Sequence, residues 1–199
     1  ELKAVLADCD LLLVTTDLPA AQFFLNRFSR QWEIPALFVG IYERAFGGEV
    51  FYSVPGEQNA CYHCFLAHVQ NELAFPEPEL SEAEMRLAYS VPTAEASQVI
   101  AQPGLSTDIQ FISQVAAKWA IAALLHETPS PLKSLVHPRL NVAFVGSGNA
   151  ALMPNVIQHY FPQAGYEERR EWEFTRPFQV LFYPVEKQRK CPVCGGEEV

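Results

Sequence analysis

Four of the five cysteines in the chain occur as two Cys-x-x-Cys pairs, Cys61 with Cys64 and Cys191 with Cys194. Two intervening residues allow both sulfurs of a pair to bind one ion at an S–metal distance of about 2.3 Å, and two such pairs complete a tetrahedron. In a chain without a secretory signal, this pattern favours metal binding over disulfides. We therefore predict a structural zinc ion bound by Cys61, Cys64, Cys191 and Cys194.

Other interpretations of the cysteines remain open. A redox dithiol of the thioredoxin type would open a helix after a strand, whereas Pro192 and Gly195-Gly196 favour turns. His63 lies inside the first pair and is an additional candidate ligand, although four sulfurs suffice. Cys9 has no partner at this spacing, and we expect it to be a small core residue.

Length and composition indicate a globular protein, because 49% of the 199 residues are hydrophobic and 19% are charged. We expect a single domain over residues 1–199. No apolar run approaches the roughly 20 residues that span a bilayer, and no signal peptide is evident, so we expect a cytoplasmic protein with no membrane partner. The net charge of -9 disfavours nucleic acid as a partner.

The first elements follow a strand–helix–strand pattern. Residues 11–15 form a compact apolar run typical of a buried strand. Asp17-Leu18-Pro19 then opens a helix whose apolar residues recur at helical spacing, with Asn26 and Arg30 expected to face away from them. Residues 36–41 are predicted as the next buried strand, which gives the βαβ unit of a parallel sheet.

Further elements are predicted along the rest of the chain. Gly47-Gly48 indicates a turn before a strand over 49–54, and Thr107–Gln110 has the spacing of a capping box before a long helix that ends near His126. Strands are predicted over 141–145 and 178–183. Residues 75–103 are rich in Pro, Glu and Ala, and we expect a mobile crossover segment with a short helix over 81–88. The predicted fold is α/β, with a mixed, mostly parallel sheet flanked by helices.

Several of these segments together resemble the ThiF/MoeB/HesA family, whose members are related to ubiquitin-activating enzymes. The resemblance begins with Leu12-Leu13-Val14-Thr15-Thr16-Asp17 and a helix that contains Leu25-Asn26. It continues through Ile34-Pro35, Gly47-Gly48-Glu49-Val50-Phe51, Cys61-Tyr62-His63-Cys64, the long helix after Pro103-Gly104, and Cys191-Pro192-Val193-Cys194-Gly195. It covers most of the chain in order.

The resemblance implies a Rossmann-like activating-enzyme fold that uses ATP and magnesium to adenylate the C-terminal glycine of a ubiquitin-like or sulfur-carrier protein. It implies that Asp17 binds magnesium at the end of its strand, where such sheets bind ligands. From the residues alone, the favoured interpretation of Asp17 is the N-cap of the following helix, and with the resemblance the two roles are equally supported and compatible. Family members are commonly dimers, so a homodimer is also implied.

The family's Gly-rich nucleotide loop would lie upstream of the first strand. The chain begins with Glu1 rather than Met, and we expect it to be the C-terminal half of a ThiF/MoeB-like domain. ATP and Mg²⁺ are then expected to bind only when the N-terminal half is present, and the isolated chain is expected to be inactive. The family's crossover cysteine would fall near Thr93, and no cysteine occurs between Cys64 and Cys191, which disfavours a thioester at this loop because a threonine hydroxyl is a poor substitute.

Two other functions are kept as alternatives. One is a catalytically silent, zinc-stabilised scaffold that binds a protein partner. The other, less favoured, is a nicotinamide-dinucleotide-binding enzyme, because Gly146-Ser147-Gly148-Asn149-Ala150-Ala151 fits G-x-G-x-x-A and Glu167-Glu168 follow about 20 residues later. No βαβ half precedes that motif. The stretch 148–177 is longer than its family equivalent and is interpreted as an added surface element. The remaining histidines, His68, His126, His137 and His159, are expected at the surface or at helix ends.

Overall fold

The computed structural model describes residues 5–6, 8–42, 45, 47–56, 58–70, 104–136, 140–146 and 178–195. Over these residues the chain forms a five-stranded sheet in the order β1-β2-β3-β4-β5. The strands are β1 Leu12–Val14, β2 Ala36–Ile41, β3 Gly47–Ser53, β4 Val142–Gly146 and β5 Gln179–Tyr183. The helices are α2 Pro19–Trp32, α3 Tyr62–Gln70 and α5 Ser106–Leu124, followed by the 3₁₀ helix η3 Pro131–Leu135.

The sheet is mixed, as predicted, but the prediction of mostly parallel pairing is wrong for the described strands. β1 pairs parallel to β2, with Leu12 opposite Ala36, so the first βαβ unit is confirmed. The pairings of β2 with β3, β3 with β4 and β4 with β5 are antiparallel. For β2 and β3 the reason is the connection of residues 42–46, because a parallel pairing needs a crossover of a dozen or more residues.

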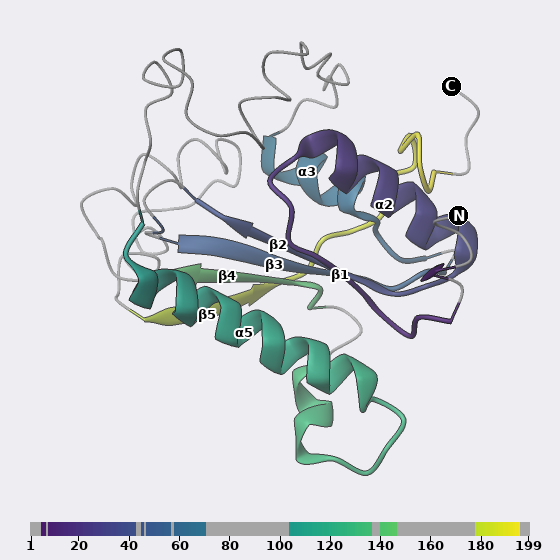
Figure 1. Ribbon diagram of the computed structural model, residues 1–199. Helices are drawn as coiled ribbons and strands as arrows, with labels where there is room; N and C mark the ends of the chain where they lie inside the picture. The colour runs from purple at the N-terminus through teal and green to yellow at the C-terminus, as the bar shows by residue number, and fades with distance from the viewer. Residues whose placement is uncertain are drawn as a thin grey trace.

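Two helical layers enclose the sheet (Figure 1). Helices α2 and α3 cover one face and α5 covers the other. Because side chains alternate across a strand, each strand contributes to both layers of the core. The α2/α3 face buries Phe28, Phe38, Phe51, Phe65 and Phe144, and the α5 face buries Leu37, Val50, Ile112, Trp119 and Val145.

Helix α2 begins at Pro19 as predicted, but the interpretation of Asp17 as its N-cap is wrong. The N-cap residue is Leu18, whose side chain makes no capping bond. Thr16 makes the polar contacts just before the helix, because its Oγ1 accepts a hydrogen bond from the Leu18 N–H at 3.1 Å and its carbonyl accepts one from Gln22 Nε2 at 2.7 Å. The Asp17 carboxylate is thus not used to start the helix.

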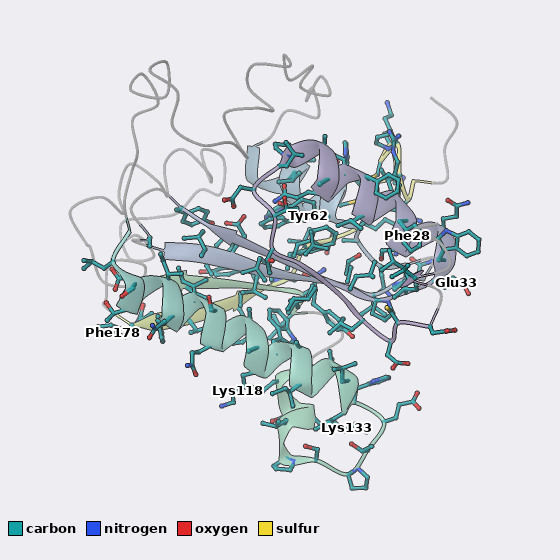
Figure 2. All side chains as sticks on the ribbon, viewed as in Figure 1. Phe28, Glu33, Tyr62, Lys118, Lys133 and Phe178 are labelled. Atoms are coloured by element: carbon teal, nitrogen blue, oxygen red, sulfur yellow. The ribbon has the colours of Figure 1, made fainter. Side chains whose placement is uncertain are left out.

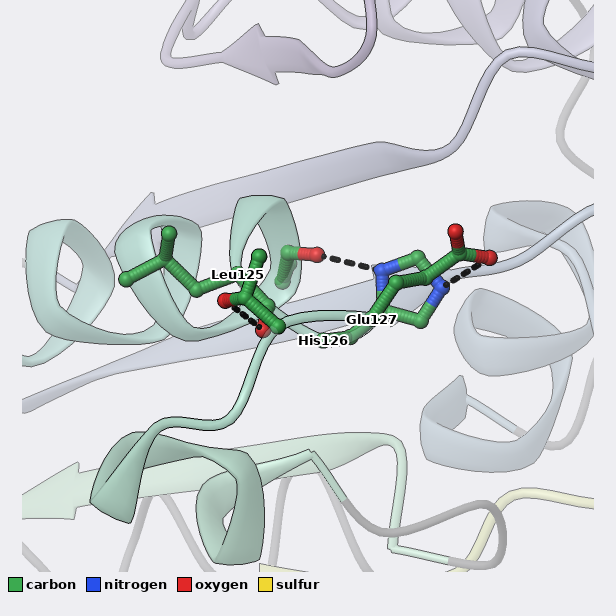
Figure 3. Close-up of polar contacts among 5 residues, drawn as sticks. Leu125, His126 and Glu127 are labelled. Atoms are coloured by element: carbon green, nitrogen blue, oxygen red, sulfur yellow. Dashed lines mark hydrogen bonds and ion pairs between the residues drawn. The ribbon is translucent and has the colours of Figure 1, made fainter.

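The predicted long helix is confirmed as α5, but the predicted capping box at its start is wrong. Its N-cap is Leu105, without a side-chain bond, and Thr107 lies inside the first turn. At the other end, His126 Nδ1 lies 2.9 Å from the Ala123 carbonyl oxygen and His126 Nε2 lies 3.5 Å from Glu127 Oε1 (Figure 3). Histidine contacts of this kind satisfy carbonyls in the last turn of a helix, so the predicted helix-end position of His126 is confirmed.

Gly47 and Gly48 belong to β3 rather than to a turn. A Cβ atom on Gly48 would lie 2.4 Å from the Gly40 carbonyl oxygen and 3.1 Å from Ile112 Cγ2. Glycine at this position therefore allows α5 to pack directly on the sheet.

Several predictions fall outside the described residues. These are the crossover segment 75–103 with its helix 81–88, the added stretch 148–177, most of the glycine motif after Gly146, and His137 and His159. The single-domain assignment stays a prediction. Among the described residues, no helix has the length and apolar character needed to cross a bilayer.

Candidate metal centre

The four predicted ligand cysteines come together in the structure. Cys61 Sγ lies 3.6 Å from Cys191 Sγ and 4.0 Å from Cys64 Sγ, and Cys64 Sγ lies 3.4 Å from Cys194 Sγ. All four sulfurs lie within 4.8 Å of one another, and none is in a disulfide. A tetrahedral ion with S–metal bonds of about 2.3 Å places its sulfurs about 3.8 Å apart. The cluster therefore fits a tetrahedral metal ion, and zinc stays the predicted occupant.

The first cysteine pair is positioned by the start of helix α3. Cys61 immediately precedes the helix and its carbonyl accepts a hydrogen bond from the Phe65 N–H at 3.2 Å, so both sulfurs of the pair lie at the helix N-terminus. The positive end of the helix dipole favours thiolates at this position. Sequence analysis missed α3, because it assigned no helix or strand to the residues that follow Cys61.

The second cysteine pair lies in a tight turn, as predicted. The Cys191 N–H donates to the Gln188 carbonyl at 3.2 Å, and the Gly195 N–H donates to the Cys191 carbonyl at 2.8 Å. A Cβ atom on Gly195 would lie 2.4 Å from the Cys191 carbonyl oxygen and 2.5 Å from that of Arg189, so the turn requires glycine.

Two asparagines attach the segment between β5 and the second pair to the sheet. Asn141 Nδ2 donates to the Val185 carbonyl at 2.9 Å, and Asn141 Oδ1 accepts from the Val185 N–H at 2.7 Å. Asn59, which lies just before the first pair, forms an isolated antiparallel bridge with Glu186. These contacts bring residues 184–190 alongside the start of α3 and so align the two cysteine pairs.

Asn26 is a further residue of the centre, and the expectation that it faces away from the core is wrong. It is fully buried on α2. Its Nδ2 lies 3.7 Å from Cys61 Sγ, and its Oδ1 accepts from the Tyr62 N–H at 3.0 Å. Tyr62 in turn stacks on Phe38, with ring centroids 4.1 Å apart, between the helices and the sheet (Figure 2). The Gln188 N–H donates to Cys64 Sγ at 3.4 Å.

These donors belong to the outer shell that orients metal ligands in proteins. The only sequence signal for Asn26 was its inclusion in the Leu25-Asn26 part of the family resemblance.

Hydrogen bonds among the four sulfurs shift the pKa values of their thiols in opposite directions. Hydrogen bonds from Cys194 first, and then from Cys61 and Cys64, lower the pKa of the Cys191 thiol. The hydrogen bond with Cys191 is the largest cause that raises the pKa of Cys61. Four clustered thiolates, three of them buried, need a compensating charge, which a divalent cation at the centre of the cluster would supply.

The other residues near the cysteine pairs have structural positions. His63 Nε2 is buried without a hydrogen-bond partner among the residues that the structure describes, and its ring packs near Phe23 with centroids 5.7 Å apart. It does not join the cysteine cluster. Cys9 is partly buried and packs against the α2/α3 core, as expected.

Asp17 lies outside the cysteine cluster. It is exposed and lies three residues after the end of β1, at the carboxyl end of the parallel pair β1 and β2. None of the hydrogen bonds found among the described residues uses its carboxylate. The position is the one at which open α/β sheets bind ligands.

Gly146, the first residue of the dinucleotide-like motif, is the last residue of β4. β4 is antiparallel to both of its neighbours. A dinucleotide fingerprint requires a parallel βαβ setting, and β4 does not provide one.

Comparison with known proteins finds similar folds among solved structures. No family model matches the chain, and no curated protein matches it. Among solved structures, E. coli MccB is similar over 96% of this chain and 41% of its own, with 14% identity and a TM-score of 0.50. The heterocyclase TruD matches over 94% of this chain and 22% of its own, with 18% identity and a TM-score of 0.47.

At this identity, the likeness to MccB shows a shared fold. The resemblance to the ThiF/MoeB/HesA family drawn from the sequence therefore stays a prediction. MccB has been solved with ATP and with MccA. This chain spans about 41% of the length of MccB.

Proposed function

We propose that the chain is part of an enzyme that uses ATP to adenylate the C-terminal glycine of a ubiquitin-like or sulfur-carrier protein. The observation that carries the proposal is the exposed Asp17 carboxylate, which is free of any capping role and follows β1 at the carboxyl end of the parallel pair. The fold shared with MccB over 96% of the chain supports it.

The proposed chemistry is the activation of a carboxylate. Oxygen of a carboxylate is a poor leaving group, and its conversion to an acyl-adenylate provides AMP instead. Magnesium, when bound with ATP, offsets the charge of the triphosphate. In this chain Asp17 would hold the magnesium ion. The clustered cysteines, by contrast, are assigned to structure, because a thiolate bound to zinc in a closed four-sulfur site is not an available nucleophile.

The nucleotide-binding half of the enzyme is proposed to pair with the outer edge of β1. Within the described residues, β1 has a neighbour on one side only. Leu13 on this strand is 53% exposed, although both of its strand neighbours are buried. An added strand and its helix would cover this edge, as sheet edges with apolar side chains require.

ATP–pyrophosphate exchange by the intact protein tests the proposal, with and without partner proteins that end in Gly-Gly. We expect exchange that depends on the partner. Asp17→Asn should reduce it by about 10²-fold or more, because one charge that positions the metal and nucleotide is lost. Asp10→Asn removes an exposed acid at the opposite end of β1 and should leave exchange unchanged. Folded protein that exchanges with no partner would refute the proposal.

A zinc-stabilised scaffold remains the second candidate. The observation in its favour is that the metal centre is complete within this chain and needs no nucleotide. A scaffold would bind the partner protein without exchange, and Asp17→Asn would not alter that binding.

A further inference from the structure

A pocket of about 260 Å³ lies at the end of the sheet opposite to Asp17. Pro35, which precedes β2, and Val54, which follows β3, both line it. Because β2 and β3 are antiparallel, these two residues lie together at the end where β2 starts. Asp17 lies at the other end, beyond the last residue of β1. The residues that line the pocket are Pro35, Tyr52, Val54, Asn59, Ala60, His126, Val136 and Asn141.

Hydrogen bonds hold one wall of this pocket in place. Arg30 Nη1 donates to the Val54 carbonyl at 3.2 Å, and Arg30 Nη2 donates to the Gly56 carbonyl at 2.6 Å. Ser53 Oγ donates to the Ala60 carbonyl at 3.5 Å. A wall that is already fixed loses little conformational freedom when a ligand binds, so more of the contact energy appears as affinity.

Two polar side chains in the pocket are available to a ligand. None of the hydrogen bonds found among the described residues uses the Tyr52 hydroxyl or the Asn59 side-chain amide. Both groups are neutral, and each can donate and accept. Burial raises the pKa of Tyr52, so its hydroxyl keeps its proton near neutral pH. His126 differs from them, because both of its ring nitrogens already have partners (Figure 3).

The rest of the lining restricts the size and charge of a ligand. Pro35, Val54, Ala60 and Val136 provide apolar surface. No Asp, Glu, Lys or Arg occurs among the described residues that line the pocket, so a charged ligand would find no opposite charge there. A volume of about 260 Å³ is below the range of about 300–1,000 Å³ that drug-sized ligands occupy, and it suits a single substituted ring.

We propose that this pocket binds a small neutral aromatic molecule that carries a hydroxyl group. The ring packs against the apolar residues, and the hydroxyl bonds to Tyr52 and Asn59. A hydroxyl group suits this pair because it donates one hydrogen bond and accepts others, whereas a ligand without polar atoms would leave both side chains desolvated and unpaired. The site does not depend on the proposed adenylation, because it uses none of the residues assigned to that reaction.

Titration of the intact, zinc-loaded protein with p-cresol, followed by protein-observed NMR, tests the site. Toluene lacks the hydroxyl group, and para-toluate replaces it with an anion of similar position. We expect p-cresol to bind with a Kd of about 1 mM or tighter. Toluene and para-toluate should each bind about tenfold more weakly, because one loses the hydrogen bonds and the other brings an unpaired charge into an apolar pocket.

Variants of two lining residues locate the binding. Tyr52→Phe keeps the ring and removes the hydroxyl, so it should reduce the preference for p-cresol over toluene about threefold or more and leave toluene binding unchanged. Val136→Trp should fill the pocket and abolish binding of both molecules. Ile121→Trp is its matched control, because Ile121 is 49% exposed on α5 and does not line the pocket, and it should bind as wild type does.

Several results would overturn the assignment. Absence of saturable p-cresol binding, or binding that survives Val136→Trp, would remove the site. An unchanged preference for p-cresol in Tyr52→Phe would remove the role of the hydroxyl, and this variant keeps the test decisive should Val136→Trp not fold. Tighter binding of para-toluate would overturn the neutral ligand class. Tighter binding of toluene would overturn it too, and would assign the pocket to an apolar side chain of a protein partner.

Discussion

Glu49 carries a buried carboxyl group whose protonation depends on the fold. Its pKa of about 7 in the folded chain lies above its ordinary value of 4.5. Between these values the folded state holds a proton that the unfolded state releases, so stability falls as the pH rises from about 4.5 to about 7 and is level above that. The difference amounts to about 3 kcal/mol.

Glu49→Gln should remove this pH dependence. We expect chemical denaturation at pH 5 and pH 8 to show the variant gaining stability relative to wild type at pH 8. Comparing the two proteins at each pH cancels the contribution of the cysteines. A wild-type and variant pair with parallel pH profiles would contradict the assigned pKa.

Asn26 tests whether the outer shell matters to the metal centre. Asn26→Ala leaves the Tyr62 N–H without its acceptor and Cys61 without its donor, so metal affinity should fall about 10- to 100-fold in competition with a chromogenic chelator. Ser29→Ala is the control, because Ser29 is buried one turn further along α2 and its hydroxyl donates to the Ile34 carbonyl at 2.6 Å rather than to a residue of the metal centre. It should change stability but not metal affinity. Equal losses of metal affinity in Asn26→Ala and Ser29→Ala would mean that Asn26 affects the metal centre only through the stability of the fold.

The residues of the metal centre differ in how far the sequence reveals them. Cys-x-x-Cys spacing is local, so it predicted the sulfur cluster that the structure shows. The contact of Asn26 with Cys61 joins α2 to α3, and no local pattern encodes it. The sequence allowed two roles for Asp17, magnesium binding and capping of α2. The structure excludes the capping role, because Thr16 makes the side-chain contact at the start of α2.

At the scale of elements, α5 packs on the sheet through a row of buried residues that begins with Ile112. Ile112 is fully buried against β3 at Gly48. Ile112→Ala should destabilise the fold by about 2–5 kcal/mol, as large-to-small core changes do. Ile121 is 49% exposed on the same helix, and Ile121→Ala should change stability by less than about 1 kcal/mol. Urea denaturation of the two variants measures the difference. Similar losses of unfolding free energy in the two variants would mean that α5 packs on the sheet through a different face of the helix.

Element positions followed from local pattern more reliably than their pairing did. β2 has the predicted bounds and α2 begins at the predicted Pro19, because apolar runs and proline act locally. Strand direction depends on connections across the fold, and there the expectation of mostly parallel pairing failed. Gly47-Gly48 was mistaken for a turn, since the reason for glycine at 48 is the approach of α5 and not a chain reversal.

At the scale of the whole molecule, the metal is expected to couple the start of α3 to the segment after β5. Purified protein should contain about one zinc per chain by elemental analysis, as a single tetrahedral site requires. Chelation should lower the thermal midpoint, because the site links α3 to the turn after β5. The double variant Cys61→Ser with Cys191→Ser should lose zinc and release the C-terminal segment to proteolysis.

Cys9→Ser provides the matched control for this metal experiment. Cys9 packs against the same core but lies outside the sulfur cluster, so its variant should keep its zinc. A metal-free double variant with unchanged stability and protease resistance would show that the cluster does not hold the fold together.

The wide separation of the two cysteine pairs in the sequence sets an order of events during synthesis. Cys61 and Cys64 leave the ribosome with α3, whereas Cys191 follows Cys61 by 130 positions. At the usual 5–20 residues per second, the first pair waits on the order of 10 s for the second. During that interval two thiols lie at a helix N-terminus with no partner sulfurs. Cellular zinc or oxidants have access to these thiols until β5 pairs with β4. The metal centre therefore closes late in the synthesis and folding of this chain segment.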